Sequence, residues 1–148
     1  MAEGIFLKML QHEDLTAHYD IDSAGLISSH QGELADSRMR FHASKRDYTL
    51  THRSRPVTKA DFDRFDLIIG MDDDNIKGLN RLASTQHQKA KIHRMTDFCK
   101  ILNDTFVPDP YYGGDKGFEH VIDLLEDACQ GLLLEISDGS KFPKNSTN

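Results

Sequence analysis

The stretch Asp66–Leu82, DLIIGMDDDNIKGLNRL, decides the fold that this sequence predicts. It opens with an uninterrupted apolar run, Leu67–Ile69, which is typical of a strand buried on both faces of a parallel sheet. The acidic residues after this run favour the start of a helix, because negative charge stabilises a helix N-terminus. We therefore predict a helix from Asp73 to Leu82. A buried strand followed directly by a helix indicates an α/β architecture.

Two further strands and several helical segments are predicted on either side of this stretch. The last helical segment has the strongest pattern, because its apolar side chains recur at helical spacing over about five turns. The strands are predicted at Tyr19–Ser23 and Lys91–Arg94, and the helical segments at residues 2–18, at Asp36–Lys45, after a capping box at Thr58–Asp61, at Asp97–Leu102 and at Phe118–Ile136. Strands that alternate with helices predict one α/β domain with a parallel sheet and helices on both faces.

A second stretch, Val107–Gly114, reads VPDPYYGG and carries the candidate chemistry. Each proline fixes its own φ, and Pro110 also disfavours helical backbone at Asp109, so the carboxylate is held on a stiff, extended loop. A rigid loop that presents a carboxylate beside aromatic rings suits a general acid at the mouth of a cleft. Turn residues also cluster in this way in ordinary loops, so the pattern alone leaves open a solvated aspartate without a catalytic role.

The composition suits a single acidic domain. The chain has 148 residues, of which 38% are hydrophobic, and this is enough for one domain with a real core. Its formal net charge of -6 argues against non-specific binding to nucleic acid. No apolar run approaches the roughly 20 residues that span a bilayer, and no signal peptide is visible. We therefore expect a cytoplasmic protein without nucleic-acid or membrane partners. Two cysteines without close spacing agree with a reducing compartment, and Cys129 falls on the apolar stripe of the last helix, where a packed thiol is expected.

Five further segments, together with Val107–Gly114, are similar to sequence blocks of the low-molecular-weight protein tyrosine phosphatases. They occur in family order at Ile21–Gly25, Ala35–Arg38, His52–Arg55, Phe65–Asp72 and Gly117–Glu119. The resemblance extends over residues 1–136, which form the expected phosphatase-like domain, and leaves residues 137–148 as a polar tail. It implies a small doubly wound parallel sheet, which has four strands in the family, with helices on both faces.

The resemblance also implies roles for individual residues. Asp109 stands where the family has the general acid that protonates the leaving phenol oxygen. Tyr111 and Tyr112 stand where side chains form the wall that grips the substrate ring. Ser29 stands near a substrate-wall position that is usually aromatic. Three residues stand at positions that support the phosphate loop of the family: Ser23, His52 and Asp72.

One part of the family pattern does not occur in residues 1–148. The nucleophile of the family is the cysteine of a Cys-x5-Arg phosphate loop. The sixth residue after Cys99 is Thr105, and the sixth after Cys129 is Glu135, so neither cysteine begins such a motif. The resemblance places this loop, and the first and central strand before it, upstream of this sequence. We therefore expect the 148-residue chain to be inactive by itself. Because neighbouring strands lose backbone partners, we also expect it either to be poorly stable or to borrow a strand from elsewhere.

No cofactor or metal site is predicted. Asp72–Asn75 is similar to the start of a calcium-binding loop, but Ile76 occupies a ligand position and Lys77 replaces the required glycine. The eight histidines form no His-x3-His pair and have no companion cysteines at metal-ligand spacing.

Three functions follow from these observations as alternatives. The first is a tyrosine phosphatase that acts on a phosphotyrosine protein or a small aryl phosphate and has its cysteine in a longer form of the chain. The second is a non-catalytic relative that serves as a binding or regulatory module. The third is an arsenate reductase on the same scaffold, although Cys99 and Cys129 do not stand at the redox positions of such enzymes. The oligomeric state is not predicted.

Overall fold

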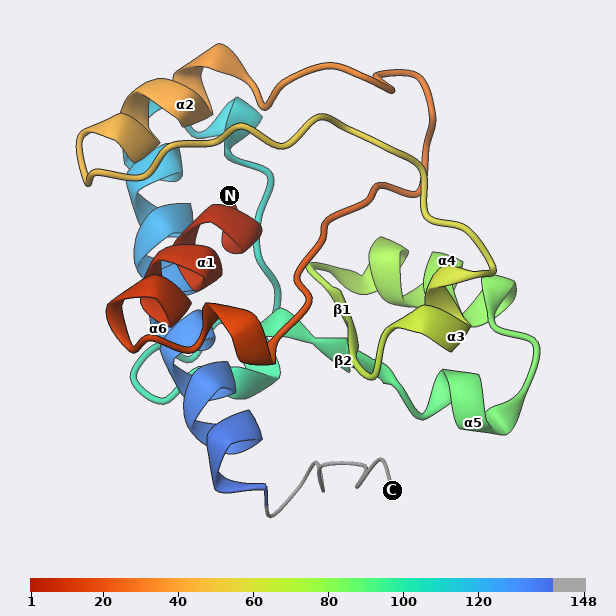
Figure 1. The fold of residues 1–148 in the computed structure, drawn as a ribbon. Helices are drawn as coiled ribbons and strands as arrows, with labels where there is room; N and C mark the ends of the chain where they lie inside the picture. Colours follow the sequence, from red (N-terminus) through yellow and green to blue (C-terminus); the bar gives the residue numbers. More distant parts are fainter. Residues whose placement is uncertain (140–148) are drawn as a thin grey trace.

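A computed structural model describes residues 1–139, in which a small parallel sheet lies between two groups of helices (Figure 1). Of the predicted polar tail, residues 140–148 lie outside the described residues. The helices are α1 (Ala2–His12), α2 (Ser37–Ser44), α3 (Asp61–Arg64), α4 (Asp73–Leu82), α5 (Gln86–Lys89) and α6 (Gly114–Asp138); the 3₁₀ turns are η1 (Thr16–His18), η2 (Met95–Phe98) and η3 (Pro110–Tyr112); and the strands are β1 (Ile68–Gly70) and β2 (Ile92–Arg94).

The sheet contains two parallel strands within the described residues, and Ile68 pairs with Ile92. Strand β2 falls inside the predicted range Lys91–Arg94, and β1 overlaps the predicted apolar run Leu67–Ile69 and ends one residue after it. The third predicted strand, Tyr19–Ser23, is wrong: Tyr19 has extended backbone (φ -133, ψ 133), but the segment belongs to no strand. Alternating side chains can favour an extended backbone, whereas a strand also requires a neighbour for its N–H and C=O groups.

The two faces of β1 pack against different groups of side chains. Ile68 contacts a small cluster formed by Phe62, Leu79 and Ala83, while Ile69 contacts the main core. The sheet thus has α3, α4 and α5 on one side and α1, α2 and α6 on the other (Figure 1). The prediction of an α/β fold with helices on both faces of a parallel sheet is confirmed.

Helix α1 is shorter than predicted. It ends at His12, and of the remaining residues that the sequence favoured as helix only Thr16–His18 form a 3₁₀ turn, η1. Asp14 has φ 55, a left-handed conformation that cannot continue an α-helix but that aspartate tolerates better than most residues. The apolar spacing of this segment did not reveal that interruption.

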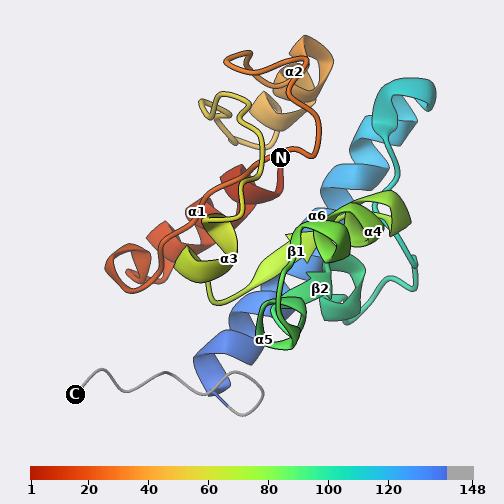
Figure 2. The same ribbon diagram turned by 90° about the vertical axis from the view of Figure 1, so that its right-hand side faces the viewer.

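Helix α6 forms most of the main core and is the longest element (Figure 2). Its predicted apolar stripe is buried, and the helix also extends beyond the predicted range at both ends. At Gly131 it lies so close to η2 that an added Cβ would stand 1.8 Å from the backbone oxygen of Phe98, so only glycine fits there. Neither α6 nor any other described helix is both long enough and apolar enough to cross a bilayer.

Candidate active site

The loop Val107–Gly114, hereafter the acid loop, follows η2 and residues 99–106 and leads into the start of α6. Its first residue is buried and donates its N–H to the backbone oxygen of Met71, at 2.8 Å. Asp109 has extended backbone (φ -73, ψ 116), as the sequence predicted from Pro110. The Asp109 carboxylate is exposed to solvent and accepts a hydrogen bond from the backbone N–H of Tyr111, at 2.9 Å. The loop therefore presents Asp109 in a defined position.

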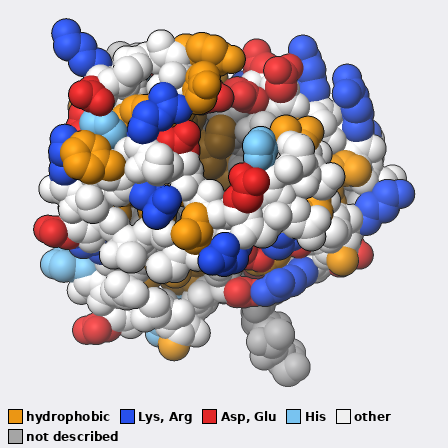
Figure 3. All heavy atoms as spheres, turned by 90° about the horizontal axis from the view of Figure 1, so that it is seen from above, with side chains coloured by type: hydrophobic (Ala, Val, Ile, Leu, Met, Phe, Trp, Pro, Cys, Tyr) orange, Lys and Arg blue, Asp and Glu red, His pale blue; other side chains and the backbone are white. Residues whose placement is uncertain are grey.

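A cavity of about 270 Å³ lies where the acid loop meets the N-terminus of α1. No side chain caps this helix end, whose free N–H groups give it a partial positive charge. Figure 3 shows a face that is hollowed at its centre, with hydrophobic side chains on the floor and charged and histidine side chains around it. The cavity is lined by Met1, Ala2, Met71, Asp72, Val107, Pro108, Asp109, Pro110, Val121 and Leu125. A helix N-terminus and a carboxylic acid at one cavity suit a small anion that must receive a proton.

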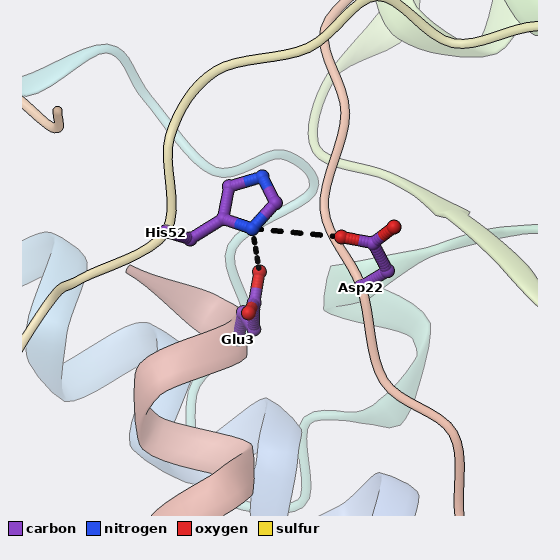
Figure 4. A group of neighbouring side chains, drawn as sticks. All are labelled: Glu3, Asp22 and His52. Atoms are coloured by element: carbon purple, nitrogen blue, oxygen red, sulfur yellow. Dashed lines mark ion pairs between the residues drawn. The ribbon is translucent and has the colours of Figure 1, made fainter. Parts of the chain in front are cut away.

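A cluster of polar side chains lies at the first turn of α1, next to the cavity (Figure 4). The Ser23 hydroxyl donates a hydrogen bond to the Glu3 carboxylate. Nδ1 of His52 lies 3.3 Å from a Glu3 carboxylate oxygen and 3.5 Å from an Asp22 carboxylate oxygen. The other ring nitrogen, Nε2, is buried and has no hydrogen-bond partner within the described residues. Ser23 and His52, which the sequence singled out separately, are thus brought together by Glu3.

Arg55 balances the negative charge of this cluster. Its guanidinium lies 2.9 Å from an Asp22 carboxylate oxygen and donates two hydrogen bonds to Asp61, each at 3.0 Å. The bonds to Asp61 are the main reason that the pKa of Arg55 is raised, so the guanidinium stays charged.

Glu3, Asp22 and His52 are also the described residues best placed to hold a metal ion. Each offers one ligand atom, and these atoms lie within 4.8 Å of one another. Carboxylate oxygens and imidazole nitrogens are ligand types that zinc accepts. However, the Glu3 carboxylate already accepts a hydrogen bond from the Ser23 hydroxyl, and the Asp22 carboxylate already pairs with the Arg55 guanidinium. The present hydrogen bonds account for the arrangement without an ion.

Asp72 lines the cavity and also begins α4. Its carboxylate accepts the N–H of Asn75 at 2.8 Å, and the Asn75 amide oxygen accepts the N–H of Met71 at 3.0 Å. These two bonds fix the carboxyl end of β1 to the start of α4. The acidic stretch after the strand is therefore a helix start, as predicted.

The tyrosines of the acid loop lie outside the cavity lining. Tyr111 is 58% exposed and Tyr112 is 87% exposed, and their rings meet edge to face with centroids 5.0 Å apart. Ser29 is exposed on a separate loop and does not line the cavity. The structure adds Arg38, whose guanidinium carbon lies 4.6 Å from the centre of the Tyr111 ring.

Neither cysteine has the environment of a nucleophile. Cys129 is 1% exposed, and burial raises its pKa to about 12. Burial likewise raises the pKa of Cys99, to about 11. A thiol of such high pKa is almost entirely protonated at neutral pH and attacks slowly. The prediction that Cys129 is a packed core thiol is confirmed.

Sequence reasoning gave no role to Glu3, Asp22, Arg38 or Arg55. Asp22, Arg38 and Arg55 lie inside the segments that resemble the phosphatases, so their location was a signal, whereas their partners were not visible. Glu3 lies in the resembling range 1–136 as well, but only the fold places α1 beside the loop that carries His52.

Comparisons with known proteins agree with this geometry. A family model described as low molecular weight phosphotyrosine protein phosphatase matches residues 1–141. A Synechocystis protein assigned to the low-molecular-weight protein-tyrosine-phosphatases is 42% identical over 91% of this chain and 86% of its own length. The low-molecular-weight protein-tyrosine-phosphatase of Streptomyces coelicolor is 34% identical over 93% of this chain and 85% of its own length. A crystal structure of a protein tyrosine phosphatase from Entamoeba histolytica superposes with a TM-score of 0.90 at 47% identity, over 93% of this chain and 88% of that one.

Proposed function

Because this chain belongs to the low-molecular-weight phosphotyrosine protein phosphatase family, we propose that it supplies the general acid and the substrate wall for hydrolysis of phosphotyrosine monoesters. The carboxyl of Asp109 at the cavity beside the N-terminus of α1 is the observation that carries this proposal. The substrate is a phosphotyrosine protein or a small aryl phosphate, and the two unpaired thiols suit a cytoplasmic location.

The proposed reaction has two steps. A thiolate attacks phosphorus, the bond from phosphorus to the phenolic oxygen breaks, and Asp109 gives that oxygen its proton. Water then attacks phosphorus of the cysteinyl phosphate while the Asp109 carboxylate takes a proton from that water. The bond from phosphorus to sulfur breaks, which releases inorganic phosphate and restores both the thiolate and the protonated Asp109. The positive end of α1 stabilises the phosphoryl oxygens in both steps.

The nucleophile in this proposal is a cysteine outside residues 1–148. Cys99 and Cys129 have raised pKa values and begin no Cys-x5-Arg motif. By this proposal the 148-residue chain alone forms no cysteinyl phosphate. The phosphate loop of the longer form follows an additional strand, and this strand lies beside the extended segment Tyr19–Ser23. That segment belongs to no strand within the described residues, and this supports the placement.

Three residues would support the phosphate loop. His52 has a buried Nε2 that bonds no other residue of 1–139, and this nitrogen can bond a neighbouring loop. Ser23 holds Glu3 at the first turn of α1, and Asp72 fixes the carboxyl end of β1 where that turn meets the cavity. Tyr111 and Tyr112 form the wall for the substrate ring, and the position of Ser29 leaves one side of that wall open.

The mass of the intact protein from its native source tests whether a longer form exists. We expect a mass above the 16.8 kDa of residues 1–148. A mass of 16.8 kDa would instead favour the second function, a binding or regulatory module without catalysis. A phosphotyrosine peptide that bound to the chain and was not hydrolysed would then support that module.

Replacement of the acid tests the role of Asp109. In the active form, Asp109→Ala should lower kcat on a phosphotyrosine peptide by about 10²-fold or more. The loss should be smaller on p-nitrophenyl phosphate, because nitrophenolate leaves without help from a proton. Asp97→Ala, at an exposed aspartate of η2 outside the cavity lining, is the matched control and should retain activity. Equal losses on both substrates would contradict the role of Asp109 as a general acid.

A further inference from the structure

The side chain of Arg38 connects the acid loop to the helical part of the molecule. Its guanidinium carbon lies 4.6 Å from the centre of the Tyr111 ring and 5.3 Å from the centre of the Phe118 ring. Tyr111 belongs to the acid loop, whereas Phe118 is a buried residue of α6. One planar cation thus contacts both an exposed ring of the acid loop and a buried ring of the core helix α6.

The Arg38 side chain is itself held in place by Asp36. Nε and Nη2 of Arg38 donate to the two oxygens of the Asp36 carboxylate, at 3.2 and 3.1 Å. The same carboxylate caps α2 by accepting the N–H of Arg38, at 2.8 Å. These bonds to Asp36 raise the pKa of Arg38 and lower that of Asp36, so both groups are charged at neutral pH. A fork of two parallel bonds fixes the plane of a guanidinium, which a lysine ammonium cannot reproduce.

The contact with Tyr111 reaches Asp109 through one hydrogen bond. The backbone N–H of Tyr111 donates to the Asp109 carboxylate at 2.9 Å. The tyrosine side chains of the loop are otherwise largely exposed, and the tandem glycines Gly113 and Gly114 after them offer little stiffness. The position of the Tyr111 ring on Arg38 therefore restrains the part of the loop that holds the carboxylate.

We propose that Arg38 is a positioning residue for the general acid, which it holds at the cavity by stacking on Tyr111. The role rests on the proposed function of Asp109, since Arg38 does not line the cavity and acts through Tyr111. Arg38 also orients the Tyr111 ring, which forms part of the substrate wall. This ring matters more in this chain, because Ser29 stands near a wall position that is usually aromatic.

Two variants of Arg38 and one matched control test this role. Arg38→Met removes the charge, and Arg38→Lys keeps the charge but loses the planar fork. Arg64→Lys is the control, because the Arg64 guanidinium carbon also lies over a ring, 4.7 Å from the centre of Phe65, and pairs with Asp20 at 2.9 Å, but outside the acid loop.

The first readout needs no catalysis. Backbone ¹⁵N relaxation should give the Tyr111 amide an order parameter of about 0.85 in the native protein, which is typical of a rigid backbone. In Arg38→Met the order parameter should fall below about 0.6. Arg38→Lys should show the same direction, and Arg64→Lys should show no change. Unchanged order parameters in both Arg38 variants would overturn the proposal.

The second readout is kinetic, in the active form of the protein. Arg38→Lys should lower kcat on a phosphotyrosine peptide by roughly tenfold to 10²-fold, with a smaller loss on p-nitrophenyl phosphate, because a displaced acid matters less when the leaving group is good. Native-like kcat on both substrates would overturn the role. If the native protein showed no turnover, the proposed function would fail, and the order parameters would still decide whether Arg38 anchors the loop.

A variant of Asp36 guards against simple loss of folding. Asp36→Asn keeps an N-cap that is as good as aspartate but removes the charge that holds the guanidinium. It should loosen the Tyr111 amide and lower kcat in the same direction as Arg38→Lys, at a native-like Tm. A rigid Tyr111 amide in Asp36→Asn would contradict the proposed restraint.

Discussion

The face where α2 packs on α6 and the segment Tyr19–Ser23 are held by different means. On the helical face, Arg46 bonds three carboxylates of α6, at 2.6 Å to Glu119, 2.7 Å to Asp123 and 3.1 Å to Glu126. The segment Tyr19–Ser23 has no strand partner and is held by side chains, such as the Arg64–Asp20 pair at 2.9 Å. One region is closed by packing and long-range polar bonds, whereas the other belongs to no strand within the described residues. Both regions contribute to the candidate site. Val121 and Leu125 of α6 line its cavity, and Ser23 bonds Glu3 at the first turn of α1.

The largest effect should come from the helical face. Phe118 is 2% exposed and its ring stacks on His42, with centroids 5.1 Å apart. Phe118→Ala should lower the free energy of unfolding by about 3–5 kcal/mol, because it leaves a cavity in the main core. Urea denaturation measures this change. Phe106→Ala, at a half-exposed phenylalanine, should lower the free energy of unfolding much less. Equal losses in the two variants would contradict the special contribution of the helical face.

A smaller effect is expected at the buried histidine of the same face. His42 is 2% exposed and bonds Glu119 at 2.7 Å and Asp115 at 3.2 Å. His42→Ala should cost about 1–3 kcal/mol, because it removes one of the two partners of the half-buried Glu119 carboxylate and the buried ring that stacks on Phe118. The matched control is His120→Ala, at a 45% exposed histidine that pairs with Asp104 at 2.6 Å and should contribute at most about 1 kcal/mol. Thermal melts of both variants measure the two losses, and a lower Tm for His120→Ala than for His42→Ala would contradict the expected order.

Acid should weaken the helical face through Glu119. Hydrogen bonds with His42 and then Arg46 lower the pKa of this carboxyl. A carboxyl with a lowered folded-state pKa adds stability above its ordinary value of about 4.3, and this stability is lost as the pH falls through the folded-state pKa. The urea midpoint should therefore drop on acidification below that value. In Glu119→Gln this drop should be smaller, and an identical pH profile would exclude Glu119 as a contributor.

The smallest effect on stability should come from the catalytic candidate. The Asp109 side chain is exposed, and the amide oxygen of Asp109→Asn can still accept the N–H of Tyr111. The free energy of unfolding should change by no more than about 0.5 kcal/mol, although activity falls. A larger loss of unfolding free energy in a denaturation curve would mean that the Asp109 carboxylate also has a structural role.

Local chemistry explains which elements could be predicted from the sequence. Helix α4 begins and ends where predicted, because Asp72 caps it with its own side chain and the preceding strand has a continuous apolar run. The extended backbone of Asp109 follows from Pro110 alone. In both cases the cause lies within a few residues of the effect.

Long-range partners explain what could not be predicted. Tyr19–Ser23 has a strand-like sequence, but pairing depends on chain segments far away. The Glu3–Ser23–His52 cluster joins three distant segments, and Arg38 meets Tyr111 only because α2 packs on α6. Spacing along one segment carries no information on such meetings. The resemblance identified most of these residues, whereas the structure supplied their contacts.

Gly131 fixes the rotation of α6 about its own axis. With the backbone oxygen of Phe98 in the place of any side chain, the helix can neither turn nor slide without displacing η2. The acid loop leads directly into the first turn of α6, at Gly114. The direction in which the chain leaves Asp109 is therefore set from the far end of the same helix. A substitution at Gly131 would therefore shift α6 and, through its first turn, the acid loop, although Gly131 itself lies outside the cavity lining.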